Sequence, residues 1–229
     1  MKLGIMQPYF FPYIGYFHLI KEVDEFVIYD DVNFIKGGWI NRNRILLGDQ
    51  SSYINIPILG ASSFKKINEI SIGKDVDLIL NKIRNSYSKA PYFKSVFPFI
   101  SDLIKYETDS LSHHLAHSII EISNYFDLNT KFLYSSEIQK DNNLKGQDKV
   151  LSICSIQGAK SYYNAIGGVS IYSKEVFENK GIDLKFIKSY SIEYKQYEQK
   201  FISNLSIIDV MMFNDTSTIK EYFEKYQLI

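Results

Sequence analysis

Polar and aromatic side chains crowd the segment that follows the first apolar run of the chain. Its candidate substrate-binding residues are Gln7, Tyr9, Tyr13, Gly15 and Tyr16. The segment leads into a predicted helix, whose first N–H groups are unpaired and whose positive dipole end favours anions. A glycine near that helix start lets a ligand approach the backbone. We therefore expect an anionic substrate group to bind here. The alternative is an aromatic packing loop, which the position after the first strand argues against.

The spacing Tyr13-Ile14-Gly15-Tyr16 resembles the His-x-Gly-His motif of nucleotidylyltransferases and class I aminoacyl-tRNA synthetases. In those families the motif also follows the first strand, and its histidines stabilise a triphosphate. Tyrosine is neutral at physiological pH and supplies no imidazolium charge, but it still donates a hydrogen bond. Nucleotidyl transfer, which would require Mg²⁺, is therefore kept as an alternative.

Two adjacent carboxylates, Asp30 and Asp31, end the next predicted strand. Either can act as a general base toward an attacking amine or orient it, so both are candidate catalytic residues. Neighbours in an extended chain point to opposite faces, so we expect one of them to face a given site. The alternative is a structural capping role.

Four further substrate-binding candidates follow: Trp39, Asn41, Arg42 and Arg44. The two arginines are two residues apart in a predicted strand and should share a face. Guanidinium groups suit bidentate binding of phosphate or carboxylate, and Trp39 with Tyr9 can stack on a base or sugar. Solvated arginines are the alternative.

Three other features are weaker candidates. Gly167 and Gly168 follow a short predicted strand, where backbone N–H groups can face a ligand, and we count both as substrate-binding candidates. Asp209 lies in an apolar helical segment, which indicates a structural tether. His113 and His117 are one helical turn apart, but no Glu or Cys accompanies them at a known metal-site spacing, and we expect no metal site.

Composition narrows the class of protein. The chain has 229 residues, with 26 Lys plus Arg and 26 Asp plus Glu, so its formal net charge is zero. A general DNA-binding protein would need a basic surface, and we expect no DNA partner. Cys154 is the single cysteine, so no intramolecular disulfide forms, as is usual in a reducing compartment. Lacking a signal-peptide pattern or a stretch long enough to span a membrane, the sequence predicts a cytoplasmic protein.

Alternating strands and helices predict an α/β fold, with a Rossmann-like parallel sheet, a small antiparallel insertion and extra helices. We expect one domain over residues 1–229, with the insertion at about 39–127. Parallel strands are predicted at 2–6, 25–29, 131–134, 161–164 and 183–187, and inserted strands at 39–47, 53–59 and 67–72. Helices are predicted at 13–22, 75–88, 91–106, 110–126, 147–157, 174–179, 205–213 and 219–226.

Several of these segments together resemble the WbqC-like family. The matching stretches are residues 7–12 with Gly15-Tyr16-Phe17, Asp30-Asp31 with Trp39 and 41–44, Tyr87 with 90–92, Gly167-Gly168 with Tyr172, and 205–209. The resemblance covers nearly the whole chain. It implies a bacterial protein linked to surface-polysaccharide (O-antigen) biosynthesis, which attaches an aminoacyl or similar group to an amino sugar.

We therefore expect a transferase that forms an amide on a nucleotide-linked amino sugar. Tyr13, Gly15, Tyr16, Arg42 and Arg44 would hold the diphosphate, and positioning would supply much of the rate acceleration. The sequence does not identify the acyl or aminoacyl donor, and no cofactor is evident. The alternatives are the Mg²⁺-dependent nucleotidylyltransferase and a non-catalytic sugar-nucleotide binding protein. The helices between 75 and 126 either cover the sheet or form the dimer face of a homo-oligomer.

Overall fold

A six-stranded sheet forms the centre of the computed structural model, which describes residues 1–197 and 200–229. Its strand order is β10-β9-β8-β1-β2-β7, and all neighbours run parallel except β10, which is antiparallel to β9. The strands are β1 (Lys2–Met6), β2 (Glu25–Ile28), β7 (Lys131–Tyr134), β8 (Ser161–Ala165), β9 (Asp183–Ser189) and β10 (Tyr226–Leu228). The predicted α/β class with a mostly parallel sheet is confirmed.

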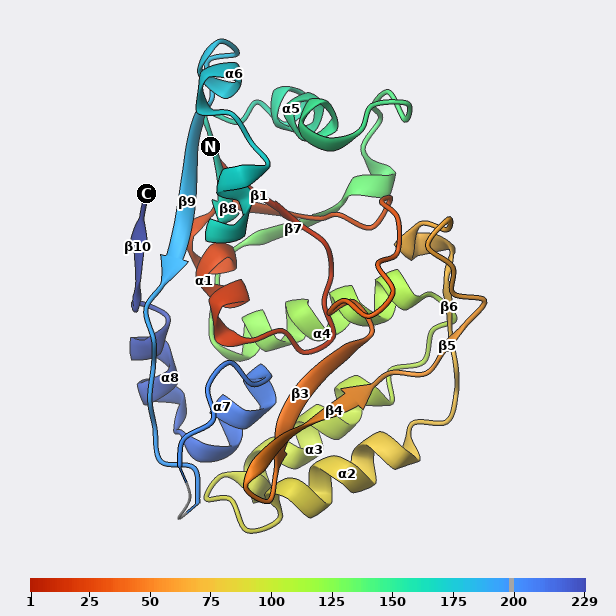
Figure 1. Cartoon of the computed structure of the whole chain (residues 1–229), viewed down its shortest axis with the longest axis vertical. Helices are drawn as coiled ribbons and strands as arrows, with labels where there is room; N and C mark the ends of the chain where they lie inside the picture. Colours follow the sequence, from red (N-terminus) through yellow and green to blue (C-terminus); the bar gives the residue numbers. More distant parts are fainter. Residues whose placement is uncertain (198–199) are drawn as a thin grey trace.

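Helices cover both faces of this sheet. On one side lie α1 (Ile14–Glu22) and α4 (Leu111–Tyr125), and on the other α5 (Gly146–Ile156) and α6 (Lys174–Glu178) (Figure 1). Side chains of β2 alternate accordingly: Phe26 and Ile28 join the core with α1 and α4, whereas Val27 joins the core with α5 and α6. This period of two is what a strand buried on both faces requires.

The remaining elements extend the α1 side of the sheet (Figure 1). The insertion contains the hairpin β3 (Arg42–Leu47) and β4 (Gln50–Asn55), the pair β5 (Ile58–Leu59) and β6 (Ser71–Ile72), and helices α2 (Asp77–Tyr87) and α3 (Phe93–Ile104). The chain closes with α7 (Ile207–Phe213) and α8 (Thr216–Tyr222). Short 3-10 helices are η1 (Ile67–Glu69), η2 (Ser135–Glu137) and η3 (Ile166–Ser170). One apolar core runs from α1 and α4 into the insertion, while the single domain over 1–229 stays a prediction.

Four of the predicted elements have clearly wrong bounds. The strand expected at 53–59 is divided between β4, which begins at Gln50, and β5. The strand expected from Trp39 begins at Arg42, because the Trp39 carbonyl accepts a hydrogen bond from the Phe10 N–H (3.2 Å) instead of joining the hairpin. The strand expected at 67–72 is mostly η1, with β6 as its last part. The last helix ends at Tyr222, and Tyr226 begins β10, since the edge of β9 offers backbone groups for a further strand.

A buried carboxylate fastens the connection between β9 and α7 to the core. Asp209 is fully buried and accepts hydrogen bonds from the hydroxyls of Tyr87 (2.8 Å) and Tyr194 (2.6 Å) and from the Gln196 amide (2.7 Å). The Tyr87 hydroxyl in turn accepts from the Leu46 N–H of β3. Burial raises the pKa of Asp209, and the three donors act against that shift. The predicted tether role therefore has a visible structural basis.

Replacing Asp209 by Ala should destabilise the fold by about 3 kcal/mol or more, because each buried donor left unpaired costs about 1–3 kcal/mol. Chemical denaturation measures this loss. Asp102→Ala, at an exposed position of α3, is the matched control and should change stability by less than about 0.5 kcal/mol. Equal stability of the two variants would contradict the tether.

Candidate functional site

The order of the strands places a crevice beside β1. The chain leaves β1 toward β2 and β7 and returns on the other side with β8 and β9. In open α/β sheets, ligands bind outside the carboxyl ends of the strands at such a reversal. Three segments reach this edge: residues 7–13 after β1, η3 after β8, and Ser189 at the end of β9. The predicted position of the site agrees with this topology.

Hydrogen bonds fix the loop that leaves β1. The Asn43 amide of β3 donates to the carbonyls of Phe10 (3.1 Å) and Phe11 (2.8 Å), and the Ser206 hydroxyl donates to the same Phe11 carbonyl (2.7 Å). The Ile207 N–H of α7 donates to the Pro12 carbonyl (3.0 Å). These bonds hold Phe11 at a φ of 41°, a region that residues other than glycine rarely adopt. The loop is therefore preorganised by two distant parts of the chain.

One pocket, here called the aromatic pocket, opens beside this loop. It has a volume of about 310 Å³, and its lining residues are Tyr9, Pro12, Tyr13, Trp39, Asn43, Arg44 and Asn204. Four of the predicted binding residues thus come together: Tyr9, Tyr13, Trp39 and Arg44. Trp39 is 41% exposed and Tyr13 38%, so both rings offer an accessible face for stacking.

Arg44 is the single charged residue among the described residues that line the aromatic pocket. Its Nη2 donates to the Asn204 carbonyl (3.3 Å), and its guanidinium carbon lies 5.7 Å from the centre of the Trp39 ring. Its Nε is buried and has no hydrogen-bond partner. An unpaired buried donor of a charged group is costly, and a ligand oxygen at this position would relieve that cost.

Arg42 and Asn41 are placed differently. Arg42 donates from Nε to the Gly38 carbonyl (3.1 Å) and from Nη2 to the Gly37 carbonyl, and its guanidinium packs over the Tyr53 ring at 4.5 Å. The Asn41 carbonyl accepts from Ile56 N–H (2.9 Å). The Arg42 side chain and the Asn41 backbone thus both make contacts at the start of the β3–β4 hairpin. Their predicted roles in substrate binding remain untested.

A second pocket, here called the hydroxyl pocket, lies on the other side of Tyr13. Its volume is about 300 Å³, and it shares Tyr13 and Asn204 with the aromatic pocket. Its hydroxyl groups come from Ser189, Ser191, Ser203 and tyrosines, and its apolar wall includes Ile14, Ile187 and Leu205. None of the described residues that line it is charged. The two pockets together could hold a ligand with two chemically different ends.

Gly15, Tyr16 and Gln7 line neither pocket. A Cβ added to Gly15 would lie 2.4 Å from the Tyr13 ring, so only glycine leaves room for that ring. Tyr16 is buried, and its hydroxyl donates to the Gln7 carbonyl (3.0 Å). Burial raises the pKa of Tyr13, and a hydrogen bond with Ser189 partly offsets this shift. Tyr13 is therefore a neutral phenol at physiological pH.

The two glycines after β8 differ in their surroundings. Gly168 packs tightly, because an added Cβ would lie 3.1 Å from Cγ of Asn164 and 3.2 Å from the Phe186 ring. Gly167 has open space around it. The neighbouring Ile166 lines the hydroxyl pocket, so η3 forms part of its rim.

Asp30 and Asp31 are both buried, with 1% and 4% of their surface exposed. Asp30 accepts from the hydroxyls of Ser112 (3.1 Å) and Ser136 (2.7 Å) and from the Ser136 N–H (3.0 Å). These donors belong to α4 and η2, so the carboxylate links β2 to elements that follow it by more than eighty residues. The two side chains diverge, as the extended backbone predicts.

Asp31 forms a buried ionic cluster with two lysines. Lys140 and Lys149 each place Nζ 2.9 Å from its carboxylate, and the Ser135 hydroxyl donates to it (2.7 Å). Burial alone would raise the pKa of Asp31, but Lys140, Ser135 and Lys149 outweigh it and hold the pKa below its ordinary value. Asp31 is thus paired with two ammonium groups, whereas the donors to Asp30 are serines. A substrate amine would have to displace a protein donor to reach either carboxylate, and their catalytic role stays a prediction.

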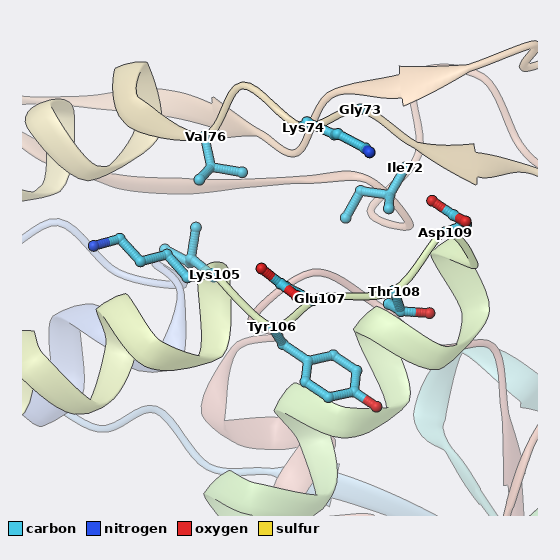
Figure 2. A pocket seen from close by; sticks show the side chains of 10 residues that line it. Ile72, Gly73, Lys74, Val76, Lys105, Tyr106, Glu107, Thr108 and Asp109 are labelled. Carbon is cyan, nitrogen blue, oxygen red and sulfur yellow. The ribbon is translucent and has the colours of Figure 1, made fainter.

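Other candidate groups lie away from the strand ends. A cavity of about 610 Å³ lies between residues 72–76 and 105–109 (Figure 2), and none of the described residues that line it is a predicted site residue. In the described part of the chain, no group of three or more His, Cys, Asp or Glu side chains is arranged to hold a metal. His117 instead stacks on Tyr106 at 3.8 Å, and His113 packs on Tyr134. Cys154 is buried, which raises its pKa to about 12.

Two residues that line the aromatic pocket, Asn43 and Asn204, were not predicted from the sequence. Asn43 lies in the Asn- and Arg-rich run that was singled out, and its position between the two arginines on a strand predicts that it points to the opposite side. No sequence pattern of this kind marks Asn204. It reaches the pocket through the long connection between β9 and α7, a contact that only the tertiary structure reveals.

These features define an α/β protein with two adjoining pockets beside a preorganised loop at the carboxyl ends of its parallel strands. Residues 7–221 match the WbqC-like protein family, and the chain belongs to that family. It is also similar to the uncharacterized protein Rv1507c of Mycobacterium tuberculosis, with 26% identity over 226 residues that cover 96% of each chain. No solved structure matches the chain. Among the described helices, none has the length and apolar character needed to cross a membrane.

Gly15→Ala should displace the Tyr13 ring and weaken binding of any ligand that uses both pockets, by about tenfold or more, which corresponds to about 1.4 kcal/mol. Isothermal titration with a sugar nucleotide that binds the wild type would measure this loss. Asp102→Ala, at an exposed position of α3, is the control. It should leave affinity unchanged. Unaltered affinity in Gly15→Ala would show that Tyr13 is not part of the site.

Proposed function

We propose that this protein is a transferase that forms an amide on a nucleotide-linked amino sugar. The acyl or aminoacyl group would come from an activated donor, and the product would serve surface-polysaccharide (O-antigen) biosynthesis in the cytoplasm. Family membership supports the biological setting, and the two adjoining pockets support the substrate class.

The observation that carries the proposal is the unpaired Nε of Arg44 beside the exposed ring of Trp39. A sugar nucleotide has a flat base, an anionic diphosphate and a neutral sugar. The aromatic pocket suits the first two, since rings stack on the base and the guanidinium binds a phosphate oxygen. The uncharged hydroxyl pocket suits the sugar, because it would penalise a desolvated phosphate. Tyr13 and Asn204 lie at the junction and can donate to the linking oxygens.

A non-catalytic sugar-nucleotide binding protein is the second candidate. It is favoured by the engagement of both Asp30 and Asp31 with protein donors, which leaves neither carboxylate free to serve as a base. Nucleotidyl transfer has less support. Tyr16, which takes the place of a motif histidine, is buried, and its hydroxyl donates to the Gln7 carbonyl. The candidates differ in outcome: transfer yields an acylated sugar nucleotide, whereas a binding protein shows affinity without turnover.

A thermal-shift panel of nucleotides and sugar nucleotides, with and without Mg²⁺, tests the substrate class. We expect stabilisation by an amino-sugar nucleotide without metal, since ligand binding raises stability in proportion to the logarithm of its concentration. Stabilisation only by a nucleoside triphosphate with Mg²⁺ would overturn the proposal in favour of nucleotidyl transfer.

Arg44→Ala should weaken binding of that sugar nucleotide by about 1–3 kcal/mol, the value of a hydrogen bond to a charged group. Arg84→Ala, at an exposed position of α2, is the matched control and should bind as the wild type does. Arg42→Ala should show the same loss if the Arg42 guanidinium also contacts the diphosphate. Unchanged affinity in Arg44→Ala would exclude the phosphate role.

A further inference from the structure

A histidine and a serine from distant parts of the chain form a hydrogen-bonded pair at the end of β9. The Nδ1 atom of His18, in α1, lies 2.9 Å from Oγ of Ser189, the last residue of β9. The Nε2 atom of His18 lies 3.0 Å from the Tyr222 carbonyl oxygen. Neither residue was a candidate in the sequence, and the function proposed above gives neither of them a role in the reaction.

The carbonyl of Tyr222 determines the direction of these bonds. A carbonyl oxygen only accepts, so Nε2 of His18 carries the proton and donates to Tyr222. In the neutral ring Nδ1 is then the acceptor, and the Ser189 hydroxyl donates to it. Burial lowers the pKa of His18, while the nearby charges of Lys21 and Glu224 act in opposite directions. The imidazole is therefore neutral and oriented to take a proton from Ser189, as in nucleophile–base pairs of hydrolases and transferases.

Ser189 is accessible to a small molecule. It is partly exposed and lines the hydroxyl pocket, whereas His18 is fully buried behind it. Its place at the carboxyl end of a parallel strand is the usual one for reactive groups in α/β proteins. Tyr13 and Asn204 line the same pocket and carry hydrogen-bond donors that can face a developing oxyanion.

The lining also points to the chemical class of the ligand. Ile14, Ile187 and Leu205 form an apolar wall, and no described lining residue carries a charge. Beside the neutral sugar that the proposed function places there, such a pocket fits an uncharged acyl chain. An ammonium or carboxylate group would lose hydration there without a compensating ion pair.

We propose that Ser189 is a nucleophile that accepts an uncharged acyl group from an activated ester or thioester, with His18 as its base. The inference rests on the proposed function for the identity of the final acceptor. Oγ attacks the acyl carbonyl while His18 Nδ1 takes the hydroxyl proton, and the donor's alcohol or thiol leaves with that proton. The sugar amine then attacks the acyl-serine carbonyl, the C–Oγ bond breaks, and Oγ regains a proton from the amine through His18. The products are the amide and free Ser189.

Incubation of the whole protein with 4-nitrophenyl acetate tests the first step. We expect a burst of 4-nitrophenolate and one acetyl group on the peptide that contains Ser189, identified by tandem mass spectrometry. Ser189→Ala should abolish this label. Ser155→Ala, at an exposed position of α5 on the opposite side of the sheet, should be labelled as the wild type is. His18→Gln, which preserves a polar side chain, should slow acetylation by about 10²–10⁴-fold.

Absence of acetyl on Ser189 in the folded wild type would overturn the inference, as would equal labelling of Ser189 in wild type and His18→Gln. The wild-type peptide map requires no variant, so a misfolded mutant cannot obscure the result. The outcomes also separate the two proposals. Amide formation that persists in Ser189→Ala would rule out the acyl-serine intermediate but would agree with the proposed transferase activity. Acetylated Ser189 in a protein that binds no sugar nucleotide would support the role of Ser189 as a nucleophile and rule out the sugar as acyl acceptor.

Discussion

Asn43 and Ser206 converge on the backbone of the loop that leaves β1, and the rest of the site depends on this junction. The Phe11 carbonyl receives a hydrogen bond from each, one from the inserted hairpin and one from the start of α7. The unusual φ of Phe11 persists because these bonds are buried and leave the chain no solvated alternative. Since Tyr9, Tyr13 and Trp39 extend from this junction, the insertion and the last helices both help to build the pockets.

Charge is distributed unevenly around the sheet edge. At the ends of β2 and β7, the buried Asp31 carboxylate pairs with two ammonium groups and Asp30 is held by serine donors, since buried charges are tolerated only when they are paired or hydrogen-bonded. Beside β1, by contrast, Arg44 has a buried donor without a partner. The first arrangement holds elements together, and the second leaves binding energy for a ligand. This contrast distinguishes side chains whose partners lie within the protein from the one that has a donor free for a ligand.

The sequence predicts the parallel sheet well, because strands buried on both faces produce short apolar runs. From the order of these strands, the reversal beside β1 indicates where a candidate binding site lies. It also predicts that Tyr9, Tyr13, Trp39 and Arg44 share a function. It could not predict the contacts of Arg44 with Asn204 or of His18 with Ser189, which join residues 160 and 171 positions apart. β10 was missed because three residues of an edge strand carry too little periodicity to distinguish it from a helix end.

Trp39 is the only tryptophan of the chain, so its fluorescence reports directly on the aromatic pocket. The most direct measurement is a titration of the protein with an amino-sugar nucleotide while this emission is followed. We expect a saturable change, because a base stacked on the exposed indole ring alters its environment. Binding detected by calorimetry without any change in Trp39 emission would place the ligand elsewhere and contradict the assignment of this pocket.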